Sequence, residues 1–166
     1  MNIAKAIELA LANTILAYGA LSPDILVRAW QSLKLSPKWD ENKDRYFPMV
    51  DVRCGPYRTD PNQATMSNDC AILCGSIASD DVSHDVISKL YDDVQTVIDR
   101  MYAQFRTGAT GPELAFFNAE MTRIVGNADH FVFGGLTIGE PRPPSDDSGV
   151  NMIGITLSVH YSRADF

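Results

Sequence analysis

Val150 to Tyr161 read VNMIGITLSVHY, and from Ile153 onward every second residue has a large apolar side chain. Alternation with a period of two over this length predicts a β-strand that buries one face in a core and turns the other toward water or a partner. The expected core face consists of Ile153, Ile155, Leu157, Val159 and Tyr161, and the other face of Met152, Gly154, Thr156, Ser158 and His160.

The residues before this strand predict a loop and another strand. Residues 139 to 149, GEPRPPSDDSG, contain three prolines and two adjacent aspartates, and this composition favours a long exposed loop. Residues 130 to 138 alternate as far as Gly134 and Gly135. We therefore expect a strand here, with a bulge or bend at the two glycines.

Helical spacing is clearest from Val86 to Phe105, where apolar residues recur every three or four positions. This predicts an amphipathic helix roughly 30 Å long. A similar stripe from Ile3 to Ile15 predicts an N-terminal helix that ends near Gly19, and Leu114 to Val125 predict a further short helix.

The remaining strands are expected on both sides of a turn. Residues 47 to 54, FPMVDVRC, and residues 64 to 77 alternate, with Pro48 tolerable only near a strand start or on an edge. Residues 55 to 63 contain two prolines and a glycine and predict a turn or long hairpin loop. Residues 25 to 35 fit a strand or a helix, of which we favour the strand, and the polar residues 36 to 46 predict a surface loop.

This order of elements predicts an α+β fold. We expect a mainly antiparallel sheet of four to five strands, packed against an N-terminal helix and a long central helix. The length of 166 residues fits one domain, which we place at 1–166.

The composition excludes several classes of function. Fourteen basic and twenty-one acidic residues give a net charge of −7, and the basic residues are scattered. Since binding to phosphates needs clustered Lys and Arg, no specific nucleic-acid surface is expected, although an acidic protein suits a passage through which DNA moves without sticking. The charge disfavours anionic membranes, and no apolar run approaches the about 18 residues of a spanning helix.

Two further features concern the cellular compartment. Glu8 and Asn13 interrupt the apolar N-terminal stretch, which argues against a signal peptide. The three cysteines lack the spacing of a disulfide scaffold, a pattern typical of a reducing compartment. Cys70 and Cys74 would lie roughly 13 Å apart along a strand, so we expect them to be buried free thiols.

No motif in the chain has the residue spacing of a known catalytic site, and no catalytic residue, metal or cofactor is expected. The best candidates for acid/base or metal chemistry are Asp80, Asp81, His84 and Asp85, but aspartates at the start of a helix are typical of N-terminal capping. Ser158 and His160 share a strand face without a third catalytic partner. Asp146 and Asp147 have the wrong spacing for an EF-hand, and turn chemistry explains them.

Four stretches carry a resemblance to a known family: a helix at Met1 to Tyr18, RYFPMVDVRC at Arg45 to Cys54, a strand and long helix from Cys70 to Phe105, and the ending IGITLSVHYSRADF. In the order and type of these helices and strands the chain resembles the tail terminator proteins of long-tailed bacteriophages. These are small α+β subunits that form a ring closing the head-proximal end of the tail tube.

The resemblance implies a structural virion protein rather than an enzyme. Six copies would form a homohexameric ring that stops tube polymerisation and joins the tail to the head connector. The expected partners are other copies of the chain, the tail tube protein and the head-tail connector or neck protein, with DNA passing through the lumen but no specific nucleic acid and no membrane bound. The expected location is the tail or neck of a virion assembled in the host cytoplasm.

A cyclic ring needs heterologous contacts, which edge strands and extended loops supply. We predict Tyr57, Arg58 and Arg142 as interface residues, because aromatic and arginine side chains on polar loops are favoured at interfaces. The loop at 139–149 and the helix at 114–125 leave another neck component, a head-closure or tail completion protein, as an alternative. A metal-dependent hydrolase using Asp80, Asp81 and His84, or a small-molecule or peptide-binding module, are the remaining ones.

Overall fold

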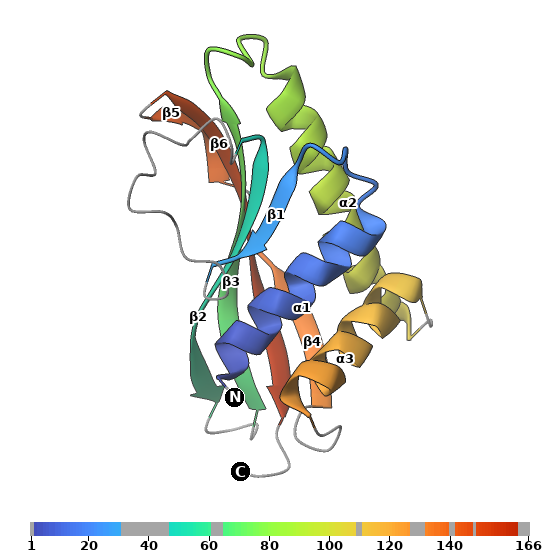
Figure 1. Ribbon diagram of the computed structural model, residues 1–166. Helices are drawn as coiled ribbons and strands as arrows, with labels where there is room; N and C mark the ends of the chain where they lie inside the picture. The colour runs from blue at the N-terminus through green and yellow to red at the C-terminus, as the bar shows by residue number, and fades with distance from the viewer. Residues whose placement is uncertain are drawn as a thin grey trace.

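In the computed structural model the described helices lie on one side of a mixed, mostly antiparallel sheet (Figure 1). The structure describes residues 2–30, 47–60, 65–108, 111–126, 132–139, 142–147 and 149–162. Within them the elements are α1 Ile3–Tyr18, β1 Leu26–Ala29, β2 Met49–Asp60, β3 Thr65–Ile77, α2 Asp85–Thr107, α3 Pro112–Val125, β4 Val132–Ile138, β5 Arg142–Asp147 and β6 Val150–Ser162. The expected α+β class is confirmed.

Strand β6 occupies the interior of the sheet. Five strands follow the order β1-β2-β3-β6-β4, and β5 pairs with β6 beside this path. β3 runs antiparallel to β6 from Ile77 opposite Val150 to Met66 opposite Tyr161. The other edge of β6 is shared by β5 near its start and β4 near its end. The alternating stretch at the end of the chain therefore holds three other strands together.

The core lies between the sheet and the helices. α1 packs against β1, β2 and α3, and α2 contacts β3, β4, β6 and α3. The apolar stripes of both long helices, as expected, are buried against the core face of the strands. The fully buried members with the largest side chains include Ile7, Leu11, Ile72, Leu90, Ile98, Phe117, Leu157 and Tyr161.

Each helix begins and ends within two residues of the predicted bounds. The Asn2 side chain accepts the N–H of Ala4 at 2.9 Å, which caps α1, and Gly19 ends this helix. Pro112 opens α3 and Gly126, with a φ of 84°, closes it in the left-handed conformation that glycine adopts without strain. None of the described helices is long and apolar enough to span a membrane.

Several strand predictions are confirmed. β4 has a register shift between Phe133 and Gly135, where we expected a bulge. β2 begins at Met49, directly after Pro48, as the missing N–H of proline requires. Within residues 25 to 35 the described part forms β1, which pairs parallel to β2. The predicted loop at 36–46 lies outside the described residues.

Two loop predictions were wrong, both because of proline. Residues 55 to 60 continue β2, since Pro56 falls in a register shift between Cys54 and Tyr57 where regular pairing is interrupted. Residues 142 to 147 form β5 rather than loop, and Pro143 and Pro144 fall in the shift between Arg142 and Ser145. Proline is compatible with a strand at such irregularities, so the composition alone was misleading.

Candidate functional site

One side of the sheet is turned away from the helices, and we call it the outer face (Figure 1). The side chains that the strands place on it are mainly polar. Strand geometry explains it, because these residues alternate with buried ones such as Val52, Ile72 and Leu157. The residues of the outer face include Arg28, Trp30, Asp51, Arg53, Arg58, Ser67, Asp69, Ala71, Leu73, Thr137, Gly154, Thr156, Ser158 and His160.

Asp69 joins three strands on the outer face. Arg58 Nη2 donates to Asp69 Oδ1 at 2.7 Å, and Ser158 Oγ donates to the same oxygen at 2.6 Å. The side chains of Arg58 and Asp69 are 66% and 57% exposed. An ion pair this exposed contributes at most about 1 kcal/mol to stability, so its main effect is to hold these polar groups in one arrangement.

A second cluster surrounds Asp51. Arg28 donates to Asp51 through Nε at 3.0 Å and Nη2 at 3.4 Å, and Arg53 Nε donates to Asp51 Oδ2 at 2.7 Å. Arg28 and Asp51 are buried, whereas 42% of the Arg53 side chain is exposed. The Arg53 guanidinium lies 4.1 Å from the centre of the Trp30 ring, close enough for a cation–π contact. One carboxylate thus holds two arginines at the edge of the outer face.

Ser158 and His160 do not form a nucleophile–base pair. His160 Nε2 lies 2.8 Å from Thr137 Oγ1, and the Ser158 hydroxyl donates to Asp69 instead. Both interactions link neighbouring strands of the outer face. The arrangement orders this surface and supplies no catalytic geometry between the two residues.

A shallow hollow of about 500 Å³ lies in the outer face. Small residues form part of its lining, at Gly55, Ala71 and Gly139, and Arg53, Asp69 and Ser158 contribute charged and polar groups. A second hollow of about 490 Å³ lies at the start of α1 and is lined by Trp30 and Tyr57, which are 39% and 49% exposed. Exposed aromatic side chains beside arginine are typical of protein interfaces.

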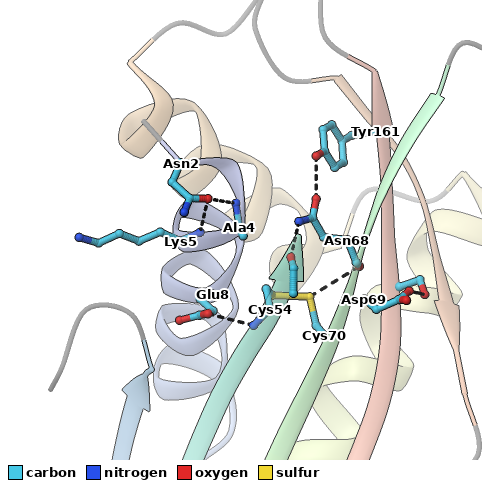
Figure 2. The surroundings of a disulfide bond; sticks show 11 residues. Asn2, Ala4, Lys5, Glu8, Cys54, Asn68, Asp69, Cys70 and Tyr161 are labelled. Atoms are coloured by element: carbon cyan, nitrogen blue, oxygen red, sulfur yellow. Dashed lines mark hydrogen bonds between the residues drawn. A yellow bond between two sulfur atoms is a disulfide. The ribbon is translucent and has the colours of Figure 1, made fainter. Parts of the chain in front are cut away.

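Polar groups are also buried between α1 and the sheet (Figure 2). Glu8 Oε2 accepts the N–H of Cys54 at 2.9 Å, and Asn68 Nδ2 donates to the carbonyl of Gly55 at 2.8 Å. The first bond fixes α1 to β2 and the second fixes β3 to β2, at the point where the register of β2 shifts. The irregular backbone of β2 is therefore satisfied by side chains from two other elements.

The expectation that Cys70 is a free thiol was wrong, because a disulfide joins it to Cys54 (Figure 2). The antiparallel register places the two residues opposite each other, with Cα atoms 4.2 Å apart, although 16 positions separate them in the sequence. Cys74 is free and buried, as predicted, and burial raises the pKa of its thiol to about 12.

Of the three predicted interface residues, Tyr57 and Arg58 lie on different faces of β2. Tyr57 and Arg58 lie on β2 rather than on a loop; Tyr57 lines the hollow at α1, and Arg58 contacts Asp69 on the outer face. Arg142 lies on β5 opposite Gly154, and its side chain is outside the description, like those of Asp146 and Asp147.

Asp81 acts as a helix cap. Its carboxylate accepts the N–H groups of Val86 at 3.0 Å and Ile87 at 3.0 Å and the hydroxyl of Ser76 at 2.8 Å. Burial would raise the pKa of Asp81, but these hydrogen bonds outweigh it and lower the pKa below its ordinary value. His84 lies at the helix start with a φ of 63°, and among the described residues no group of three potential ligands is placed to hold a metal.

The residues predicted from the sequence did not include Asp69, Arg53 and Trp30, which organise the outer face. A signal was present, because Arg28 and Trp30, like Asp51 and Arg53, are separated by two positions and share a strand face. A comparison of the chain with protein-family models finds no match, and neither does a comparison with curated proteins.

Proposed function

We propose that the chain is a structural subunit of the tail terminator type, which assembles as a ring at the head-proximal end of a phage tail tube. The observation that carries the proposal is the chemical difference between the two sides of the subunit. One side is the helix layer, and the other is the outer face, with its ordered Arg58, Asp69 and Ser158 and its hollow. A head-to-tail ring needs two such different surfaces on each copy.

The fold and the charge are compatible with this role. The resemblance implies a small α+β subunit, and the chain has an α+β fold with the sheet covered by helices on one side. A net charge of −7 favours a lumen that repels DNA passing through it. The proposed partners are other copies of the chain, the tail tube protein and a connector or neck protein.

Assembly of the purified chain tests the proposal. Native mass spectrometry and negative-stain microscopy are expected to show a ring of about six subunits, alone or on the ends of purified tail tubes. The ring is expected to stop further addition of tube protein. A chain that stays monomeric at high concentration and does not cap tubes would contradict the proposal. A ring that binds the connector but leaves tube growth unchanged would indicate another neck component.

A further inference from the structure

We propose that the outer face of one copy binds the exposed ridge of α2 from a second copy, with Arg53 and Arg58 facing its aspartates. This inference rests on the proposed function and specifies the contact that closes the ring. The two surfaces lie on opposite sides of the subunit, since α2 belongs to the helix layer (Figure 1). A contact between them is heterologous and repeats from copy to copy.

The ridge of α2 carries a line of carboxylates. Asp85, Asp92 and Asp99 are exposed and follow one another at intervals of seven residues, which brings them back to the same side of a helix with about 20° of drift per interval. We call them the acidic stripe. From Asp85 to Asp99 the stripe is roughly 21 Å long at 1.5 Å per residue.

The acidic stripe is not neutralised within the described part of its own subunit. The ion pairs of α2 there join Lys89 to Asp93 and Arg100 to Glu113, and none includes a stripe residue. The pKa of Tyr91 is raised by burial and then by nearby negative charges, among them Asp99 and Asp92. Asp92 and Asp99 thus lie near enough to Tyr91 for their charge to act on it.

The outer face offers the opposite charge and a suitable shape. In its described part three arginines accompany two aspartates, and the guanidinium groups of Arg53 and Arg58 are both accessible. Their Cα atoms are at most roughly 16 Å apart along β2, a spacing from which two long side chains can reach successive stripe carboxylates about 10 Å apart. The hollow is lined by Arg53 and extends from it across β3 and β6, and its small residues let a helix ridge approach the sheet.

Charge also argues for a second copy as the occupant. Copies with a net charge of −7 repel one another, so association needs local contacts between opposite charges. The arginines of the outer face and the acidic stripe provide such a contact within one sequence. Electrostatic complementarity of this kind sets the register and direction of association.

Charge reversal tests the contact. Asp92→Lys with Asp99→Lys gives a variant whose stripe is basic, and Arg53→Glu with Arg58→Glu gives a variant whose outer face is acidic. Each variant alone is expected to assemble at least tenfold more weakly than the wild type in native mass spectrometry and light scattering. An equimolar mixture is expected to recover assembly with alternating subunits, because the reversed stripe then meets the reversed face. Far-UV circular dichroism and thermal unfolding verify that each variant is folded.

Two further variants serve as a substitute for the outer-face variant and as a charge-matched control. Arg58→Glu alone serves if the double change on the outer face does not fold, since Arg58 is exposed. Asp24→Lys with Asp80→Lys adds the same charge as the stripe variant at exposed positions outside the stripe, and it is expected to assemble like the wild type.

The outcomes separate this contact from the proposed function. If each reversed variant forms rings as well as the wild type does, or if the mixture does not recover assembly, the proposed contact is wrong. The proposed ring would stand in either case. Rings that persist in the stripe variant but no longer cap tail tubes would assign the acidic stripe to the tube protein, which also overturns it. A wild type without any assembly or capping overturns the proposed function itself, and the contact with it.

Discussion

The Tyr161 hydroxyl donates a hydrogen bond to Asn68 Oδ1 at 2.6 Å, and both side chains are fully buried. The bond joins the end of β6 to β3, and Asn68 in turn donates to the carbonyl of Gly55 in β2. A chain of hydrogen bonds thus crosses three strands beneath the outer face. Fully satisfied buried networks of this kind favour one unique packing of the core.

We predict that Tyr161→Phe lowers the free energy of unfolding by about 1–3 kcal/mol, because the Asn68 carbonyl oxygen then stays buried without its donor. Urea unfolding followed by circular dichroism measures the change. The matched control is Tyr102→Phe on α2, which is 38% exposed and is expected to change stability by less than about 0.5 kcal/mol. Equal effects of the two substitutions would show that the hydrogen bond adds nothing beyond the loss of a hydroxyl.

The sequence predicted the elements that bury one face. Residues 150 to 161 and 86 to 105 have periods of two and of three to four, and they form β6 and α2 within one or two residues of the predicted bounds. Such patterns are local, because the spacing of apolar residues depends only on which side of its own helix or strand each residue lies. The fold class followed from their order.

Pairing between strands was not available from these patterns. The parallel alignment of β1 with β2 brings Arg28 opposite Asp51, and the register of β2 and β3 brings Cys54 opposite Cys70. Both contacts depend on which residues of distant segments lie side by side, and local periodicity contains no such information. Proline at a register shift also looks like proline in a loop, which is why the strand portions at 55–60 and 142–147 were missed.

The buried pair of Arg28 and Asp51 leads to a second prediction. Asp51→Ala leaves Arg28 buried without a counter-charge and removes a partner of Arg53, so we expect it to cost about 3–5 kcal/mol of unfolding free energy. Replacing both members, as in Arg28→Met with Asp51→Leu, is expected to recover much of this loss, because no unpaired buried charge remains. Chemical unfolding of the three proteins measures the difference.

An exposed ion pair on the same face is the matched control. Asp69→Ala removes the partner of Arg58, whose side chain is 66% exposed, and is expected to cost no more than about 1 kcal/mol. If Asp51→Ala and Asp69→Ala had the same effect, burial of the Arg28 pair would be of no consequence for stability.

The disulfide gives a third prediction. Cys54 and Cys70 close a loop across a separation of 16 residues, and the loss of this cross-link is expected to lower stability by about 3 kcal/mol. Thermal unfolding with and without a reductant measures the shift. Cys74→Ala, which removes the free thiol, is expected to keep the same difference between the two conditions.

Counting thiols checks the pairing directly. In denaturant without reductant one thiol of the three is expected to react with a maleimide, and in the native protein none is, because Cys74 is buried and its pKa is raised to about 12. Three reactive thiols in the freshly denatured, non-reduced protein would show that the cross-link is absent.

The last prediction concerns acid. The pKa of Asp81 is lower in the folded protein than the ordinary value of about 3.9, because its hydrogen bonds to Val86, Ser76 and Ile87 outweigh the effect of burial. The unfolded chain therefore binds this proton more readily than the folded one. The stability that ionised Asp81 supplies is complete above the ordinary pKa and is lost as the pH falls through the lower folded value.

Asp81→Asn, which has no charge to lose, is expected to cost about 1–3 kcal/mol at pH 7 and progressively less in acid. Urea unfolding across this pH range, with the exposed Asp80→Asn as control, measures the difference. The lowered pKa would be contradicted if the difference in unfolding free energy between the wild type and Asp81→Asn stayed constant down to the lowest pH measured. A shifted titration cannot leave this difference independent of pH.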